Sequence, residues 1–214
     1  MALNGVYRFE NKDKDHWQCN DDAKCSGAFR RGSRVLCVGS PNSGKSNLIF
    51  NFISNSQPPF DLIYLYQASE NSMEYSLINY IPLRSITDLP EVEDLPTDKK
   101  ILVILEDMDS INKESHKVLD VWLRFVCSHL GACVVIAAQN YFSIPVVLRR
   151  KMDCFILFLY GMDDLVLKHI PIHKDDKQSI INYFKKYGDK HSFITIDLAI
   201  KDKYIFNNKI ILDF

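Results

Sequence analysis

The stretch RVLCVGSPNSGKSNLIFNFI, from Arg34 to Ile53, decides the fold of this chain. Its first residues are apolar and partly β-branched and lead to Gly39, which predicts a buried strand that enters a tight loop. After the loop, apolar residues recur at helical spacing from Leu48 onward, and the segment SQPP that follows stops the helix. The stretch therefore predicts a strand, a loop and a helix in direct succession.

The loop Gly39-Ser-Pro-Asn-Ser-Gly44-Lys45-Ser46 fits the phosphate-loop pattern, Gly, four residues, Gly-Lys-Ser. Its glycines let backbone N–H groups converge on phosphate oxygens, and the positive end of the following helix faces the same anion. Lys45 is expected to reach the β- and γ-phosphates, and the Ser46 hydroxyl to bind Mg²⁺. Nucleotide contacts are expected from Gly39, Ser40, Pro41, Asn42, Ser43, Gly44, Lys45, Ser46 and Asn47.

The segment NKES at Asn112 superficially resembles the Asn-Lys-x-Asp motif that reads guanine, but it lacks the Asp. It also follows the acidic residues at 106 and 107 too closely for that motif. We therefore expect ATP, with Mg²⁺, rather than GTP.

The composition is that expected of an ordinary soluble globular protein. Of the 214 residues, 47% are hydrophobic and 25% are charged, and the formal net charge is −1. This balance gives no general attraction to nucleic acid or anionic membranes, so any such contact must be local. The apolar runs are too short to cross a bilayer, and the first residues do not have the pattern of a secretory signal. Thiols in strand-like runs, at Cys37, Cys133 and Cys154, fit reduced, buried cysteines inside a cell.

Strands and helices alternate along the chain. Further strands are expected at DLIYLYQ (61–67), ILVILED (101–107), CVVIAAQN (133–140) and DCFILFLY (153–160). Helices are expected over 112–131 and 177–187, a terminal pair of strands over 193–200 and 204–212, and a solvated linker over 85–100.

This alternation predicts an α/β fold with a largely parallel central sheet flanked by helices. In such sheets the ligand lies beyond the carboxyl ends of the strands. We expect an N-terminal extension over residues 1–30 and a single domain over residues 31–214.

Polar side chains follow two of the predicted central strands. Glu106 and Asp107 close the strand ILVIL; by position, Glu106 is expected to hold magnesium and Asp107 to activate the attacking water. The usual order in additional-strand ATPases is Asp then Glu, so this pair is inverted. Alternatively, Asp107 and Asp109 cap the segment that follows. Gln139 is expected to sense the γ-phosphate, the alternative being an amide that only satisfies a strand end.

Arg149 and Arg150 precede the strand at 153–160 and follow Pro145, which we expect to break any helix. Adjacent arginines commonly form a solvated patch. In ring ATPases, however, an arginine at this place points at the γ-phosphate of the neighbouring subunit, and such a finger changes the rate by about 10³–10⁵. The spacing alone does not distinguish the two arginines.

These segments, taken in order, resemble the FtsK–HerA superfamily, and within it the poxvirus-type genome-packaging ATPases. The resemblance is carried by the phosphate loop, LVILEDMD, VVIAAQNYFSIPVVLRR and FITIDLAIKDKYIF, and runs from about Arg30 to the C-terminus. Its most specific part is Gln139-Asn140-Tyr141-Phe142-Ser143-Ile144-Pro145 followed by Arg149. Two features depart from the family: the Glu-Asp order, and Tyr204-Ile205-Phe206 in place of a tail arginine.

The resemblance implies a RecA-like additional-strand P-loop NTPase that hydrolyses ATP and translocates double-stranded DNA into a preformed capsid. Its implied partners are DNA bound without sequence preference, further copies of itself in a homo-oligomeric ring, and capsid vertex proteins. The implied location is the host cytoplasm or a viral factory, with or without association with the virion, and not the secretory route. Local basic segments, Arg149–Lys151 and Phe184–Lys190, are candidates for salt-sensitive contacts with DNA phosphates.

Three other interpretations compete with this one. A non-viral FtsK-like or HerA-like DNA pump or conjugation motor is disfavoured by the compact chain without a membrane segment. A small P-loop kinase is disfavoured because no arginine-rich lid stands out. A nucleotide-bound structural protein of a capsid vertex would need fewer of the residues found together here: Lys45, Ser46, Glu106, Asp107 and Gln139.

Overall fold

The computed structural model of the 214-residue chain describes residues 31–54, 56, 59–67, 73–109, 111–159, 165–199, 203–206 and 210–212. The N-terminal extension expected over residues 1–30 lies outside the described residues. The strands are β1 (Arg34–Val38), β2 (Leu62–Tyr66), β3 (Ile81–Leu83), β4 (Ile101–Leu105), β5 (Cys133–Ala138), β6 (Cys154–Leu157), β7 (Ile194–Asp197), β8 (Lys203–Phe206) and β9 (Ile210–Leu212). The α-helices are α1 (Lys45–Ser54), α2 (Lys113–Val121), α3 (Val146–Arg149), α4 (Leu165–Lys168) and α5 (Lys174–Tyr187).

All these strands join one nine-stranded sheet in the order β3-β2-β4-β5-β1-β6-β7-β8-β9. The strands from β3 to β6 pair in parallel, and β7, β8 and β9 are added antiparallel at one side. β5 lies between β1, which leads into the phosphate loop, and β4, which ends at the acidic pair. This inserted strand is the defining feature of the additional-strand class, so the expected fold is confirmed. The tail forms two strands, β8 and β9, where one was expected over 204–212.

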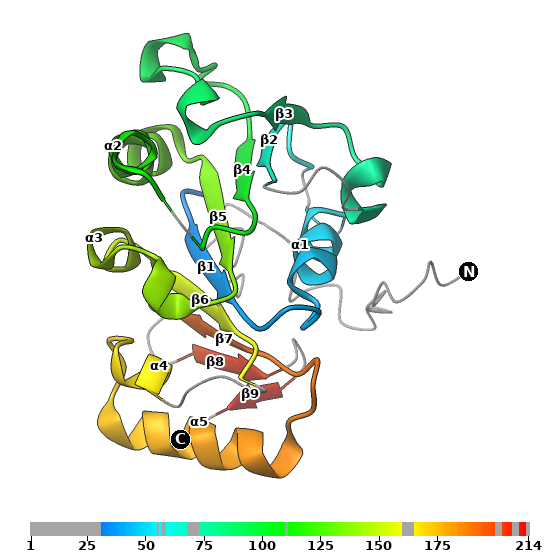
Figure 1. Cartoon of the computed structure of the whole chain (residues 1–214), viewed down its shortest axis with the longest axis vertical. Helices are drawn as coiled ribbons and strands as arrows, with labels where there is room; N and C mark the ends of the chain where they lie inside the picture. Colours follow the sequence, from blue (N-terminus) through cyan, green and yellow to red (C-terminus); the bar gives the residue numbers. More distant parts are fainter. Residues whose placement is uncertain are drawn as a thin grey trace.

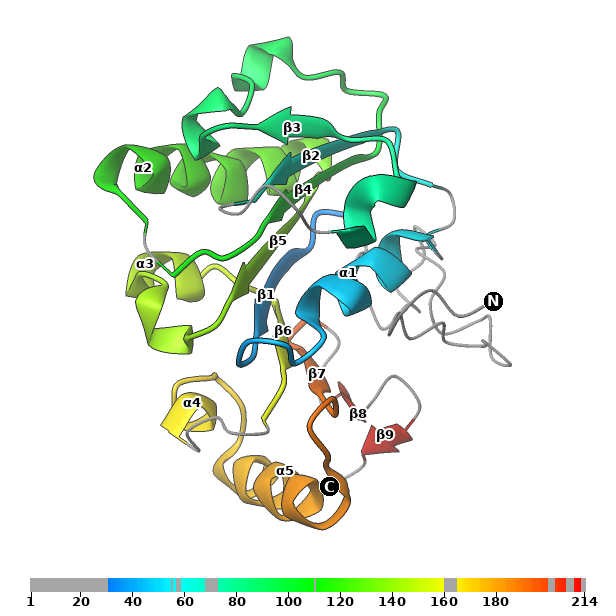
Figure 2. The same ribbon diagram turned by 45° about the vertical axis from the view of Figure 1, so that its right-hand side comes forward.

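Helices cover both faces of the sheet (Figures 1 and 2). α1 packs on one face through Leu48, Ile49 and Phe52. On the other face lie α2, with its continuation η5 (Trp122–Leu130, a π-helix), and α3, while α5 joins the same core through Ile180 and Phe184. Every residue of β4 is at most 1% exposed, as expected for a parallel strand that is covered on both faces.

The long helix after the acidic strand begins and ends as its sequence predicts. The Asn112 side chain accepts a hydrogen bond from the backbone N–H of Ser115 at 2.8 Å, which caps α2. η5 ends at Gly131, whose φ of 74° is left-handed, a conformation that glycine adopts without strain. α5 starts at Lys174, three residues before the expected start at Lys177, because His173 serves as its N-cap.

The segment over residues 85–100 differs from the solvated linker that we expected. It contains two 3₁₀ turns, and Ile86, Leu89 and Leu95 are at most 6% exposed within the core on the α2 face. These apolar residues are separated by prolines and acidic residues, so their spacing matches neither the helical nor the strand repeat and did not predict their burial. The short strand β3, which pairs with β2 at the edge of the sheet, was also not expected.

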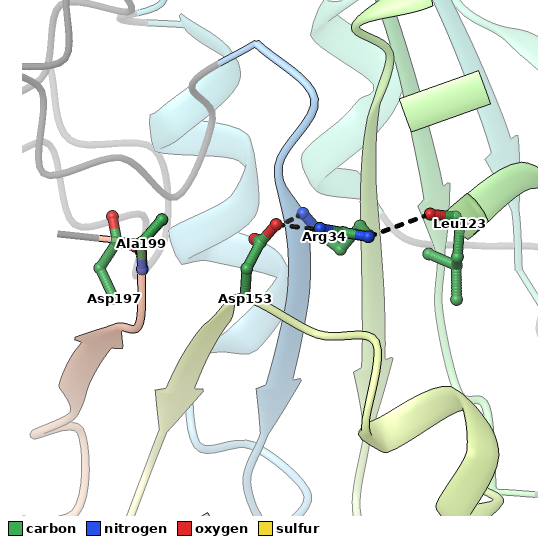
Figure 3. A network of polar contacts seen from close by, with 5 residues as sticks. All are labelled: Arg34, Leu123, Asp153, Asp197 and Ala199. Carbon is green, nitrogen blue, oxygen red and sulfur yellow. Dashed lines mark hydrogen bonds and ion pairs between the residues drawn. The ribbon is translucent and has the colours of Figure 1, made fainter. Parts of the chain in front are cut away.

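Arg34 and Asp153 connect β1 to the segment that leads into β6, at the amino ends of both strands (Figure 3). Asp153 Oδ1 accepts from the Arg34 backbone N–H at 2.9 Å, and Oδ2 accepts from Arg34 Nε at 3.0 Å. Arg34 also donates through Nη1 to the carbonyl oxygen of Leu123 in η5, at 3.3 Å. One side chain therefore joins two strands and a helix at the end of the sheet opposite the phosphate loop.

Candidate active site

The phosphate loop connects β1 to α1, and its backbone needs both glycines. A Cβ added at Gly39 would lie 2.7 Å from Cβ of Phe158, so no side chain fits there. Gly44 has a φ of 105°, and Asn42 also has a positive φ, 58°. These conformations curl the loop so that its N–H groups converge, as an anion site requires.

Lys45 is the first residue of α1 and is 9% exposed. Its Nζ donates to the carbonyl oxygens of Gly39, at 2.8 Å, and Ser40, at 3.1 Å. The ammonium group therefore lies along the loop itself, which is where phosphate oxygens are bound in this motif.

Glu106 reaches the phosphate loop from the end of β4. Its Oε2 accepts from the Ser46 hydroxyl at 2.9 Å, and its Oε1 accepts from the phenol of Tyr75 at 2.5 Å. Burial raises the pKa of Glu106 above its usual value, and the nearby Asp107 adds to this rise; the hydrogen bonds from Tyr75 and Ser46 and the nearby Lys45 offset only part of it. These donors oppose the cost of burying the carboxylate, whose residue is only 5% exposed.

The donor set of Ser46 and Glu106 fits magnesium. Both groups are hard oxygen ligands, which Mg²⁺ prefers. Their oxygens are 2.9 Å apart, close to the roughly 3 Å between adjacent ligands of an octahedron with bonds of about 2.1 Å. Within the described residues, no cluster of three or more His, Cys, Asp or Glu side chains offers a separate metal site.

Asp107 and Gln139 follow β4 and β5, two parallel neighbours whose carboxyl ends lie at the same edge of the sheet. Asp107 is half-buried and has a φ of 54°, a strained conformation for a non-glycine residue that is common at functional sites. Gln139 is exposed. The structure thus brings Ser46 and Glu106 into contact, with Lys45 nearby, and places Asp107 and Gln139 at the ends of adjacent strands.

Asp109 joins these two strand ends, a link that the sequence did not reveal. Its Oδ1 accepts from the backbone N–H groups of Gln139 and Asn140, each at 3.1 Å, and from the hydroxyl of Ser143 at 3.2 Å. Because one carboxylate oxygen holds the turn after β5, the loop that carries Gln139 is fixed to the loop that carries Asp107. Asp109 was expected only as an alternative cap.

The two arginines occupy different environments. Pro145 does not end a helix as expected: it is the N-cap of α3, because a proline at the start of a helix loses no hydrogen bond. Arg149, at the end of α3, lies over the rings of Tyr141 and Phe142, with Cζ 4.5 and 5.4 Å from their centroids. Its Nε is buried and has no hydrogen-bond acceptor among the described residues. Arg150 is exposed.

A pocket of about 610 Å³ opens beside these arginines. The described residues that line it include three basic side chains and no carboxylate. They are Tyr141, Phe142, Val146, Arg149, Arg150, Met152, Phe155, His169, Pro171 and Leu198. Exposed Val146 and Val147 on α3 continue the apolar surface next to it.

The two basic segments do not form simple cationic faces. Lys151 forms an ion pair with Asp120, which also binds Arg124 at 2.6 Å. At the end of α5, Lys185 and Lys186 are exposed. The end of α5 therefore exposes two lysines, whereas in the Arg149–Lys151 segment Arg150 is the exposed cation.

His191 is a further residue at the loop that sequence reasoning missed. Its Nδ1 lies 3.1 Å from the carbonyl oxygen of Ser43, and because a carbonyl only accepts, Nδ1 must carry the proton. The turn before β7 holds His191 through Asp189, whose Oδ1 accepts from the His191 N–H at 2.9 Å. By contrast, burial raises the pKa of the Cys37 thiol to about 12, so this cysteine beneath the loop is neutral and no nucleophile.

This sheet order, with a phosphate loop after β1 and an acidic pair after β4, defines an additional-strand P-loop NTPase. The chain belongs to the poxvirus A32 protein family, whose model matches residues 59–210. The match includes the acidic pair, Gln139 and both arginines. The phosphate loop precedes the matched residues, so its assignment depends on its own motif and geometry.

Solved structures share the fold at low sequence identity. The DNA-packaging ATPase B204 from Sulfolobus turreted icosahedral virus matches with a TM-score of 0.58 and 16% identity, over 82% of this chain and 97% of that one. The genome-packaging NTPase B204 of Sulfolobus turreted icosahedral virus 2 in complex with AMPPCP matches with a TM-score of 0.57 and 18% identity, over 82% and 96%. The pCW3 conjugation coupling protein TcpA matches with a TM-score of 0.53 and 13% identity, over 82% and 59%.

No curated protein matches the chain significantly. Among the described helices, none is both long enough and apolar enough to cross a membrane.

Proposed function

We propose that this chain is the ATP-hydrolysing subunit of a homo-oligomeric ring that translocates double-stranded viral DNA into a preformed capsid. The observation that carries the proposal is the contact of Ser46 with Glu106 beside the Lys45 loop, in a chain of the poxvirus A32 family. The B204 proteins that share the fold are described as genome-packaging enzymes, and one is in complex with AMPPCP. Residues 31–214 act as one ATPase domain in this proposal.

The proposed chemistry assigns one task to each side chain. The loop N–H groups and Lys45 bind the β- and γ-phosphates of ATP. Ser46 and Glu106 would hold Mg²⁺, which when bound neutralises charge on the phosphates. Asp107 orients the attacking water and accepts its proton, and Gln139 contacts the γ-phosphate.

Arg149, rather than Arg150, is the arginine that we assign to the neighbouring subunit's ATP. Stacking on Tyr141 and Phe142 fixes its guanidinium, so less side-chain entropy is lost when it binds an anion. In this proposal, the guanidinium donates to the γ-phosphate of a neighbour through nitrogens other than the buried Nε. The exposed valines of α3 would then be covered by that neighbour.

DNA binding in this proposal is local and independent of sequence. With a net charge of −1, the chain has no general attraction to DNA, so a small number of lysines at the end of α5 would contact backbone phosphates. The proposed site of action is the host cytoplasm or a viral factory, with capsid vertex proteins as further partners.

The proposal is tested by the steady-state ATPase rate as a function of protein concentration, with and without double-stranded DNA, beside a Lys45→Ala control. A ring whose sites are completed by neighbours should show a rate per subunit that rises with concentration and with DNA. A flat rate that ignores DNA would favour a monomeric kinase or switch. Absence of hydrolysis at every concentration would favour a structural role.

A further inference from the structure

Tyr75 contacts the carboxylate that the proposed function assigns to magnesium, and no motif pointed to it. It lies in η2 (Met73–Leu77), between β2 and β3, and its side chain is completely buried. Its hydroxyl donates to Oε1 of Glu106 at 2.5 Å, across 31 positions of sequence. The ring packs in the core on the α1 face, together with Leu48 and Ile49.

The two oxygens of Glu106 therefore have different partners. Oε1 is held by Tyr75 on the core side, and Oε2 faces the Ser46 hydroxyl at the phosphate loop. A carboxylate oxygen buried without a donor would cost free energy, so the phenol stabilises this orientation over others. The apolar packing of the ring fixes the hydroxyl in turn.

The inverted order of the acidic pair, with a glutamate at the first position, explains why the contact with Tyr75 is needed. A glutamate has one more rotatable bond than an aspartate, so its carboxylate samples more positions at the end of a strand. A donor on the far oxygen restricts that freedom and leaves the near oxygen beside Ser46. Groups that hydrogen-bond to a metal-binding carboxylate in this way typically change metal affinity or activity by about 10–100-fold when removed.

We propose that Tyr75 is a positioning residue that holds Glu106 in the orientation required to bind magnesium with Ser46. This inference rests on the proposed function, because it takes Glu106 as the magnesium carboxylate. It goes further by naming a residue outside every recognised motif and by explaining how a glutamate acts at this position.

The test compares Tyr75→Phe, which removes only the hydroxyl, with Tyr64→Phe. Tyr64 is a matched control because it is also a buried tyrosine, but its ring packs against Trp122 on the other face of the sheet. Equilibrium binding of a fluorescent ATP analogue is measured while Mg²⁺ is titrated, and again in EDTA. This readout requires neither hydrolysis, nor DNA, nor ring assembly.

Tyr75→Phe should raise the Mg²⁺ concentration for half-maximal binding by about 10–100-fold, with unchanged affinity in EDTA and an unchanged Tyr64→Phe control. Under saturating magnesium, the affinity for the ATP analogue should return toward the wild-type value. Equal magnesium dependence in Tyr75→Phe and wild type would overturn the inference, as would wild-type binding that ignores magnesium.

Glu106→Asp tests the same contact with Tyr75 intact and guards against a folding defect in Tyr75→Phe. The shorter side chain cannot keep both hydrogen bonds, so its magnesium dependence should shift in the same direction. A wild-type magnesium response in Glu106→Asp would contradict the positioning role. A wild-type protein that binds Mg²⁺ and nucleotide as expected but shows no DNA-stimulated hydrolysis would refute the proposed function and leave this inference standing.

Discussion

Glu106 and Asp107 are neighbours in sequence, but the structure gives them different environments. Glu106 is buried and held by two hydroxyl groups, whereas Asp107 is half-buried and turned away from the strand direction by its positive φ. A carboxylate held by fixed donors suits a cation site, and one that reaches solvent suits water activation. The environments therefore support the division of roles that sequence order alone left open.

Substitution of each acid by its amide should separate binding from catalysis. Asp107→Asn should lower kcat by about 10²–10⁴-fold, the usual contribution of a general base, with unchanged nucleotide affinity. Glu106→Gln replaces one of the two acceptor oxygens by an NH₂ group and removes the negative charge. It should therefore weaken magnesium-dependent nucleotide binding more than it lowers kcat. Steady-state kinetics and equilibrium binding at several magnesium concentrations check both expectations; the reverse pattern would exchange the two roles.

At the level of single residues, the sequence predicts functional residues that belong to a contiguous motif. It does not predict residues that reach the site only through the fold. Lys45 and Ser46 are recognisable because the phosphate loop is contiguous. Tyr75 and His191 are not, because the former is 31 positions from Glu106 and the latter 148 positions from Ser43. A buried tyrosine or an exposed histidine has no local signal that would separate it from many others.

At the level of elements, the turn before β7 connects the antiparallel tail to the phosphate loop. Phe193, immediately before β7, packs against Phe158, which in turn lies against Gly39. His191 adds a hydrogen bond from the same turn to the Ser43 carbonyl. The tail strands therefore support the loop as well as extending the sheet.

His191→Ala should weaken nucleotide binding by roughly 2–10-fold, since it removes one hydrogen bond worth about 0.5–1.5 kcal/mol that holds the loop. His191→Asn, which keeps a donor near the same position, should recover part of the affinity. His116→Ala, on α2, serves as a control for loss of a histidine elsewhere. The measurement is the nucleotide dissociation constant of each variant. Equal values for His191→Ala and wild type would show that the His191 hydrogen bond does not contribute to nucleotide binding.

The Arg34–Asp153 pair supports the opposite end of the same strands (Figure 3). In Asp153→Asn, a single amide oxygen replaces two acceptors, so one donor of Arg34 must face the new NH₂ group. We expect the free energy of unfolding to fall by about 1–3 kcal/mol, with little change in nucleotide affinity of the folded protein.

Urea denaturation, monitored beside the exposed control Asp98→Asn, measures this loss. The control should stay within about 0.5 kcal/mol of wild type. An Asp153→Asn protein as stable as the control would mean that the pair contributes nothing measurable. A large loss of nucleotide affinity in the folded protein would mean that the two ends of β1 are not independent.

Elements whose apolar residues recur at a regular spacing were predictable from the sequence, and elements without such a spacing were not. The central strands and the helix from Asn112 to Gly131 carry long apolar patterns and recognisable caps, so their positions are confirmed within a few residues. β3 has only three residues, one of them Pro82, and the segment 85–100 buries isolated side chains between prolines. The pairing of β3 depends on the neighbouring sheet edge, and the burial of the side chains in 85–100 depends on the α2 face, rather than on a local sequence pattern.

At the scale of the whole molecule, the fold separates two candidate functional regions. The phosphate loop, Glu106 and Asp107 lie at the carboxyl ends of β1 and β4, and Arg149 lies on α3 over a separate pocket with Tyr141 and Phe142. No hydrogen bond or ion pair among the described residues joins Arg149 to its own phosphate loop. One chain thus presents the proposed nucleotide site and, apart from it, the proposed arginine finger, as the proposed head-to-tail ring requires.

If the site is completed by a neighbour, two inactive variants should restore each other. Lys45→Ala lacks a working phosphate loop but keeps Arg149, and Arg149→Ala keeps the loop but lacks the finger. In an equal mixture, about a quarter of the interfaces of a head-to-tail ring pair an intact loop with an intact arginine. ATPase activity of the mixture should therefore exceed that of either variant alone, at concentrations where the wild-type rate per subunit has reached its plateau.

The matched control is a mixture of Lys45→Ala with a Lys45→Ala, Arg149→Ala double variant, which contains no intact loop and should stay inactive at every ratio. Arg150→Ala, tested alone, should retain most of the wild-type rate, because exposed Arg150 lacks the aromatic support of its neighbour. Recovery in the first mixture with none in the control would place Arg149 in the neighbouring site. A mixture no more active than its separate components would mean that Arg149 acts within its own subunit or not at all, and the head-to-tail ring would lose its main structural argument.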